Sequence, residues 1–347
     1  MDYKDFVEKV KADLPELLAD TMGHLFVSDT QVDKLQGLSY EGIKIVPENS
    51  TMSITLDLYP YFEMLEDNVS YDSILSWIAG KTTEAYENRP AISVEDLTDY
   101  ETVKPRLSIL LIGQEGNEER LKQIPHHPME DLALVYRIRI QENEYGTATA
   151  LITNAMLHQF GVTPEQLHQD ALEVAAAENP FAIKTMSEIF AELTGGMLIP
   201  EDTFPMYVAS NESRINGAGV IAYPNFMETA AERLSGNFYI LPSSIHDVIL
   251  LPENDAHSVK ELQEMVQEIN TSQVAPEDRL SDHVYHYDCQ NKVFERADRY
   301  EARKLGKDAR GENESNSVLD TLRGHKEVCA AIPHKPVPAH RREEAAL

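Results

Sequence analysis

The sequence predicts an α+β fold with mixed, mainly antiparallel sheet segments and packed helices. Three observations lead to this prediction. The 347-residue chain is 42% apolar and 26% charged, which is typical of a globular protein. Its apolar residues alternate with polar ones in several short segments and follow a helical period in others. The two kinds of segment do not alternate regularly, which argues against a doubly wound parallel sheet.

The first hundred residues predict a helix, a hairpin and a second helix. Residues 2–21 have a helical apolar stripe with Pro15 inside it, which predicts an amphipathic helix that bends there. The members of the stripe are Phe6, Val10, Leu14, Leu17 and Leu18. Residues 40–46 and 51–58 alternate as the two strands of a hairpin do. Residues 70–87 predict the second helix, with Ser70 as its cap.

The middle of the chain predicts strands followed by helices. Residues 106–113 are an apolar run, and residues 131–141 alternate clearly, so each predicts a strand. Residues 153–160 predict a short helix. A second helix begins behind Thr163 and Pro164 and reaches about residue 178, because these two residues form a typical helix start. A third is predicted near 181–194 and ends at a pair of glycines.

The segment from 205 to 295 predicts the remaining elements. Residues 205–251 indicate the order strand, strand, helix, strand, strand, with the second strand at GAGVIAY and a hairpin turn at Gly217-Ala218-Gly219. Ser258 and Glu261 open a helix that reaches about residue 270. Residues 284–295 predict a closing hairpin.

Charge divides the chain into two parts. Residues 1–295 contain 50 acidic and 19 basic side chains, a net charge of −31, whereas residues 296–347 carry a net +2. We therefore expect an acidic globular region over 1–295, with possible sub-lobes 1–100 and 101–295, and a flexible polar tail over 296–347. Direct binding to nucleic acid or to an anionic membrane is not expected, because both are negatively charged.

The tail contains one short apolar motif. Val318, Leu319 and Leu322 share a helical face behind Ser317. This motif is interpreted either as a transient turn or as a docking segment that folds on a partner protein. No export signal or membrane segment is recognisable, so a cytoplasmic location is expected. The two cysteines do not suffice for a disulfide framework or a thiolate zinc site.

Five segments carry a resemblance to known families over about residues 1–295. They are Ile54–Leu58, Leu134–Ile138, Thr153–Leu157, His246–Leu250 and Leu280–Tyr285. Together they resemble an uncharacterised domain-of-unknown-function (DUF) family of anaerobic gut Firmicutes, and they are distantly similar to the YtpQ family. Neither resemblance implies a known activity. The tail segment Ser317–Leu319 resembles the tails of proteins of conjugative elements, which implies a mobile-element setting.

Two groups of residues are candidates for chemistry. Ser243, Ser244, His246 and Asp247 offer the residue types of a nucleophile, a base and an orienting acid. Residues that are adjacent on one strand cannot form a catalytic site by themselves. The alternative interpretation of these four residues is a turn that is capped by the serines and followed by a buried strand. His246 and Asp247 are the catalytic candidates. No Gly-x-Ser-x-Gly elbow accompanies them in the sequence.

His283 and His286, flanked by Asp282 and Asp288, are the metal-binding candidates, because imidazole and carboxylate are ligands that zinc accepts. Residues three apart on a strand point to opposite faces, so solvated hairpin residues are the alternative. His126 and His127 are interpreted as part of a surface loop. The acidic pair Glu188 and Glu192 is interpreted as part of a solvated helix face.

These observations favour a non-enzymatic, cytoplasmic protein-interaction or accessory protein of a bacterial mobile-element or regulatory setting. Its partner is expected to be another protein, and no cofactor is expected. One alternative is a hydrolase or other small-molecule enzyme whose site is assembled from distant residues. Another is an acidic nucleic-acid mimic that occupies a basic cleft of a DNA-handling protein.

Overall fold

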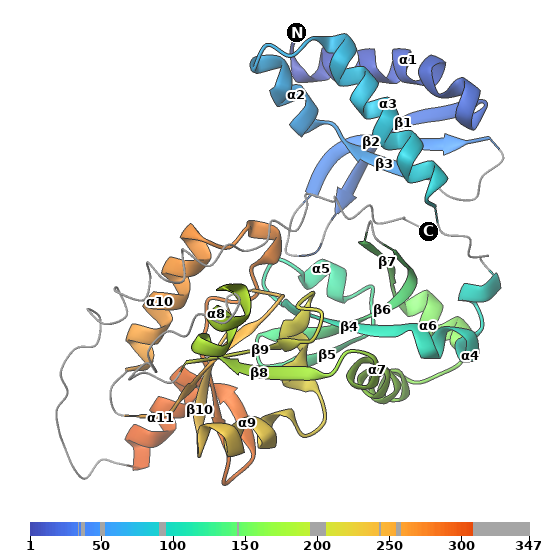
Figure 1. Ribbon diagram of the computed structural model, residues 1–347. Coiled ribbons are helices and arrows are strands. Elements are labelled where there is room, and N and C mark those ends of the chain that lie inside the picture. Colours follow the sequence, from blue (N-terminus) through green and yellow to red (C-terminus); the bar gives the residue numbers. More distant parts are fainter. Residues whose placement is uncertain are drawn as a thin grey trace. The chain divides into compact units, whose positions relative to one another are not determined.

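The computed structural model in Figure 1 describes residues 1–33, 35, 39–48, 53–89, 95–143, 146–194, 206–242, 244–254 and 258–307. Within these ranges the chain forms antiparallel sheets packed with helices, which confirms the predicted α+β fold class. Among the described residues, no helix combines the length and the apolar character that crossing a membrane requires.

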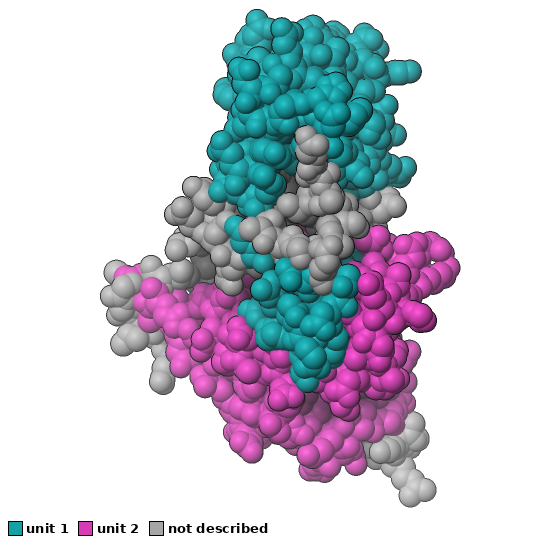
Figure 2. All heavy atoms as spheres, turned by 90° about the vertical axis from the view of Figure 1, so that its right-hand side faces the viewer, with its two compact units in different colours: residues 1–106, 137–151, 340–347 teal, residues 107–136, 152–339 magenta. Residues whose placement is uncertain are grey.

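The chain divides into two compact units (Figure 2). Of the described residues, unit 1 comprises those within 1–106 and 137–151, and unit 2 comprises those within 107–136 and 152–307. The predicted boundary between the two sub-lobes lies between residues 100 and 101. The prediction did not anticipate that a hairpin from the middle of the chain would be grouped with the N-terminal residues.

Unit 1 begins with helices that pack on a three-stranded antiparallel sheet of order β1-β2-β3 (Figure 1). Its elements are α1 (Tyr3–Met22), β1 (Leu25–Asp33), β2 (Ser39–Pro47), β3 (Ile54–Asp57), α2 (Tyr59–Glu66), α3 (Tyr71–Glu87), η1 (Glu95–Leu97), α4 (Tyr100–Val103) and η2 (Lys104–Arg106). Helix α1, the β2-β3 hairpin and α3 were predicted, whereas β1 and α2 were not. The core of the helix-and-sheet layer contains Phe6, Leu14, Ile43, Ile45 and Ile78, all fully buried.

Capping residues define the two long helices of unit 1. The Asp2 carboxylate accepts a hydrogen bond from the Asp5 backbone N–H at 2.8 Å, and Ser70 caps α3 in the same way. Pro15 lies inside α1, as predicted. One detail differs: the Leu17 side chain is 51% exposed, because the buried stripe of α1 continues through Leu18 instead.

The second sheet has the strand order β4-β6-β5, with β7 pairing with β6. The elements of this region are β4 (Leu107–Gly113), α5 (Glu118–Leu121), β5 (His126–Met129), β6 (Leu132–Asn143), β7 (Gly146–Leu151), α6 (Asn154–Phe160) and α7 (Pro164–Glu178). His126 and His127 are exposed, as predicted, but the predicted loop is wrong, because both residues lie in β5 and pair with β6. The His127 ring stacks on His168 of α7 at 4.2 Å between ring centres.

The largest sheet has six antiparallel strands in the order β13-β12-β10-β11-β9-β8. It and its helices comprise β8 (Phe181–Thr185), α8 (Met186–Thr194), β9 (Tyr207–Asn211), η3 (Gly217–Ala222), α9 (Phe226–Leu234), β10 (Phe238–Leu241), β11 (Val248–Pro252), α10 (Val259–Ser272), η4 (Pro276–Asp278), β12 (Tyr285–Asp288), β13 (Val293–Arg296) and α11 (Ala297–Lys307). Helix α10 packs Leu262 and Val266 against Tyr239, Leu241 and Leu251 of the sheet.

Three segments of this region differ from the prediction. Residues 181–185 form strand β8, and only the rest of the predicted 181–194 segment is helical. The predicted strand and hairpin turn around Gly217–Gly219 form the 3-10 helix η3 instead. Helix α11 occupies Ala297–Lys307, which lies within the predicted flexible tail. The rest of the predicted tail lies outside the described residues.

Candidate functional site

The predicted catalytic candidates lie in the loop that leads into β11. The His246 Nδ1 atom accepts a hydrogen bond from the Asn216 backbone N–H at 3.1 Å, so the ring proton is on Nε2, which is 3.3 Å from Asp278. Ser244 accepts a hydrogen bond from the His246 backbone N–H at 3.0 Å. Both ring nitrogens of His246 are therefore occupied by contacts within the chain. Ser243 lies outside the described residues, and the role of Asp247 stays a prediction.

The two metal-binding candidates contact different carboxylates. His283 Nδ1 is 2.9 Å from Asp131, and His286 Nε2 is 3.2 Å from Glu253. This separation follows from strand alternation, because residues three apart on a strand point to opposite faces. In the described ranges, no three His, Cys, Asp or Glu side chains gather closely enough to hold a metal ion. We call the two groups the Asp131 cluster (Asp131, Ser281, His283, Tyr285) and the Glu253 cluster (Asn237, Glu253, His286, Tyr300, Lys304).

In the Asp131 cluster, three side chains donate to one carboxylate. Ser281 Oγ and His283 Nδ1 donate to Asp131 Oδ2 at 3.0 and 2.9 Å, and the Tyr285 hydroxyl donates to Oδ1 at 2.8 Å. An ionised carboxylate only accepts hydrogen bonds, so His283 carries its proton on Nδ1. Its Nε2 atom has no hydrogen-bond partner among the described residues, and the side chain is 29% exposed.

Asp131 lies in the two-residue turn between β5 and β6, and this turn is held on several sides. Glu130 adopts a φ of 57°, which is uncommon for a residue with a side chain. The Gln114 side-chain amide donates to the carbonyls of Glu130 and Leu132 at 3.0 and 2.8 Å. Arg299 pairs with the Glu130 carboxylate at 2.6 Å. Surrounding contacts of this kind can hold a residue in a conformation that costs about 1 kcal/mol.

The electrostatics of the Asp131 cluster favour an ionised carboxylate. Burial alone raises the pKa of Asp131, but the hydrogen bonds from Tyr285 and His283 outweigh burial and hold this pKa below its ordinary value. Burial and the neighbouring Asp131 charge raise the pKa of Tyr285, which stays a hydrogen-bond donor. The ionised Asp131 carboxylate orients the His283 ring and leaves its Nε2 atom unbonded. In this arrangement Nε2 can accept a proton.

In the Glu253 cluster, four side chains donate to one carboxylate. His286 Nε2 and Asn237 Nδ2 are 3.2 and 2.9 Å from Oε2, and the Tyr300 hydroxyl and Lys304 Nζ are 2.6 and 3.2 Å from Oε1. These contacts, that of His286 first, hold the pKa of Glu253 well below its ordinary value despite partial burial. Tyr300 and Lys304 lie on α11, so the cluster fastens this helix to the sheet.

His286 is the most enclosed member of the Glu253 cluster. Its side chain is fully buried, and its ring stacks on Tyr300 with 3.6 Å between ring centres and 8° between planes. The Nδ1 atom is buried and has no hydrogen-bond partner in the described part of the chain. The stacking and the single bond to Glu253 position the ring as a structural support for α11.

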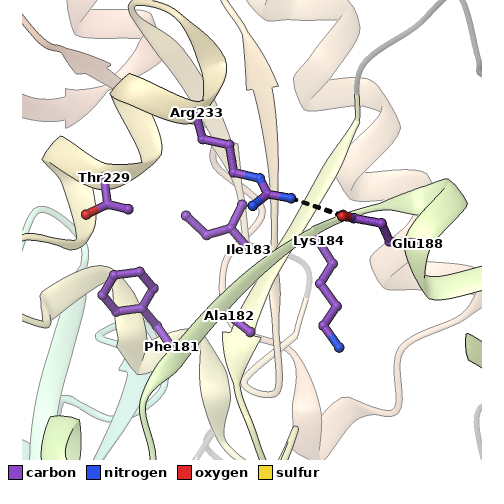
Figure 3. Close-up of a pocket in the computed structure, with 7 residues that line it drawn as sticks. All are labelled: Phe181, Ala182, Ile183, Lys184, Glu188, Thr229 and Arg233. Carbon is purple, nitrogen blue, oxygen red and sulfur yellow. Dashed lines mark hydrogen bonds and ion pairs between the residues drawn. The ribbon is translucent and has the colours of Figure 1, made fainter.

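Two open pockets lie elsewhere on unit 2. One, of about 400 Å³, is lined by Phe181, Ala182, Ile183, Lys184, Glu188, Thr229 and Arg233 (Figure 3). The other, of about 380 Å³, lies beside Tyr287 and Cys289. Glu188 and Glu192 belong to the surroundings of the first pocket, where they pair with Arg233 and Lys184 respectively. Both carboxylates are about half exposed, at 52% and 48%, which agrees with the predicted solvated helix face, and the ion pairs add contacts that were not predicted.

Sequence reasoning missed the carboxylates that organise both clusters. Asp131 is separated from Ser281 by 150 positions and Glu253 from His286 by 33. The one usable signal was the alternation of polar residues at β12. His283 lies just before this strand, and Tyr285 and His286 lie in it. The predicted docking residues Val318, Leu319 and Leu322 lie outside the described residues, so their role stays a prediction.

Comparison with known proteins identifies a family. A model of a family of unknown function (DUF5688) matches residues 3–289, which is most of the chain. No curated protein and no solved structure matches the chain. The chain therefore belongs to the DUF5688 family of unknown function.

Proposed function

We propose that this chain is a non-enzymatic protein-interaction protein whose acidic body binds a basic surface of a partner protein. The observation that supports the proposal is the net charge of −31 over residues 1–295. Exposed acidic side chains such as Asp5, Glu16 and Asp20 follow the outer side of α1. A potential of one sign over a surface steers a partner of the opposite sign and makes its binding sensitive to salt.

The test is recovery of the untagged chain from its native host, followed by titration with the purified partner. We expect one protein in stoichiometric amount, with a basic contact surface and an affinity that falls at least tenfold between about 50 and about 500 mM NaCl. Equal affinity at both salt concentrations would contradict the proposal. Competition by DNA for the same partner would favour the nucleic-acid mimic instead.

The Asp131 cluster favours a second candidate function, a hydrolase or other small-molecule enzyme with a site assembled from distant residues. The observation that supports this candidate is the unbonded Nε2 atom of His283, whose ring is oriented by the 2.9 Å hydrogen bond from its Nδ1 atom to Asp131 Oδ2. Such a ring can accept a proton from water or from a substrate hydroxyl. Purified protein that retains a small molecule, and loses it in the variant His283→Gln, supports this candidate. Equal retention by both proteins contradicts it.

The setting of the protein is also a proposal. The resemblance to families of anaerobic gut Firmicutes and to the YtpQ family supports a bacterial origin, and the tail resemblance supports a mobile-element or regulatory role. A cytoplasmic location fits the low cysteine content. Fractionation of host cells, followed by detection of the chain with an antibody, tests the location. Recovery from the membrane or the medium would contradict it.

A further inference from the structure

Strand β8 is the last strand of the six-stranded sheet. It pairs with β9 from Phe181↔Asn211 to Thr185↔Tyr207, and its other edge pairs with no strand of the described residues. A free strand edge carries backbone N–H and C=O groups that another extended chain can bind. The free edge is therefore a possible binding site, provided that its groups are accessible.

Two hydrogen bonds that flank β8 show which of its groups point outward. The Glu212 N–H donates to the Pro180 carbonyl at 3.0 Å, and the Met186 N–H donates to the Met206 carbonyl at 3.2 Å. Even-numbered residues thus face β9, and Phe181, Ile183 and Thr185 direct their backbone groups away from it. The Thr185 N–H donates to Glu188 at 2.6 Å, which leaves Phe181 and Ile183 as the free positions.

The pocket of about 400 Å³ lies along this edge. Four of its lining residues, 181–184, are consecutive. Consecutive side chains of a strand point to opposite faces, as Ile183 and Lys184 do in Figure 3, so a pocket that all four share opens along the strand edge. Thr229 and Arg233 of α9 form the opposite wall. A pocket here allows another chain to approach the backbone of β8.

The charge at this edge differs from that of its surroundings. Residues 107–295 contain 29 acidic and only 10 basic side chains. Three of the ten lie here: Lys184 and Arg214 pair with Glu192 at 2.5 and 2.8 Å, and Arg233 pairs with Glu188 at 3.0 Å. Three cations therefore share two carboxylates. The lining of the pocket itself contains two cations, Lys184 and Arg233, and one carboxylate, Glu188, so its charges complement an acidic ligand.

We propose that the outer edge of β8 binds an extended acidic peptide of a partner protein by adding it to the sheet as a further strand. The backbone of the peptide bonds to Phe181 and Ile183, its apolar side chains cover the Phe181 ring, and its carboxylates lie beside Lys184 and Arg233. This inference goes beyond the basic partner proposed above, because it concerns a different ligand at a different site.

The experiment is a phage-display selection of random peptides of about eight residues on the full-length chain. We expect the selected peptides to be enriched in acidic and apolar residues, with acidic residues on both faces of the strand, because Lys184 and Arg233 lie on opposite faces of the sheet. A synthetic peptide of that consensus should bind the variant Lys184→Glu/Arg233→Glu at least about tenfold more weakly than the parent. The matched control is Lys260→Glu, at an exposed position on α10 that pairs with Glu264 at 3.7 Å, and it should bind normally.

Two further measurements decide the site. Bound peptide should slow hydrogen exchange at the amides of Phe181 and Ile183, and circular dichroism should show that both variants are folded. No enrichment of acidic peptides, or equal binding by the double variant, would overturn the proposal. So would a dimer of the chain that protects the same two amides, since the edge would then be occupied by a second copy.

Discussion

Removal of the Glu253 carboxylate tests whether this side chain fastens α11 to the sheet. In Glu253→Ala, all four hydrogen bonds of the cluster are lost, and His286 stays buried with neither ring nitrogen bonded. An unsatisfied buried polar group costs about 1–3 kcal/mol, and a lost hydrogen bond such as that of Tyr300 costs about 1 kcal/mol. We expect a loss of about 3 kcal/mol in the free energy of unfolding.

The variant Glu253→Gln separates geometry from charge. Its amide oxygen can still accept from His286 and Asn237, and its NH2 group can donate to the Tyr300 hydroxyl oxygen, so that only the Lys304 contact is lost. We expect a loss of about 1 kcal/mol. The control Glu264→Ala removes an exposed carboxylate and should change stability by less than about 0.5 kcal/mol.

Urea unfolding followed by circular dichroism measures these three changes. The reasoning requires the order Glu253→Ala, then Glu253→Gln, then the control. If Glu253→Ala were no less stable than Glu253→Gln, the hydrogen bonds to His286 and Tyr300 would not stabilise the fold, and the structural role of the cluster would be refuted.

Four other changes have expected outcomes. The pKa of Glu253 in the folded state lies below its ordinary value of 4.5. This carboxylate therefore stabilises the fold fully above about pH 4.5, and its contribution decreases as the pH falls below that value. Between about pH 5 and about pH 3, the urea midpoint of Glu253→Gln should therefore fall less steeply than that of the parent. Parallel curves would contradict this. Gly80→Ala should raise stability by about 0.5–1 kcal/mol, because Gly80 lies inside α3 and an added methyl group meets no atom within 4 Å; a lower melting temperature would oppose it. Gly217→Ala should lower the melting temperature, because the new Cβ would lie 2.6 Å from the His246 carbonyl oxygen; an unchanged melting temperature would count against that contact. Ser258→Ala removes the cap of α10 and should cost about 1 kcal/mol in urea unfolding, with no loss counting against the cap.

Local signals made several helices predictable from the sequence. Ser258 and Glu261 form the reciprocal capping box of α10, and Thr163 caps α7 by accepting from the Gln166 N–H at 3.2 Å. These contacts join residues three apart, so their partners are visible in the sequence itself. Elements of this kind need no knowledge of the rest of the fold.

Segments decided by distant contacts were predicted less well. Residues 181–185 were assigned to a helix, although Phe181 and Ile183 also fit the period of a strand, and only pairing with β9 decides between the two. Around Gly217, the close approach of Ser210 and His246 selects a compact 3-10 turn over the expected strand. Neither contact leaves a local signal in the sequence.

The two clusters show why the candidate site depends on one short strand. The polar residues from Ser281 to His286 alternate along the lead into β12, so that His283 meets Asp131 and His286 meets Glu253. Shifting this segment by one residue would turn every side chain to the other face and leave both carboxylates without their donors. The register between β12 and β10, in which His286 lies opposite Tyr239, is therefore coupled to the contacts of both acids. The sequence reveals the alternation, whereas the choice of acid depends on the turn at Glu130 and on the end of β11, which only the folded chain brings together.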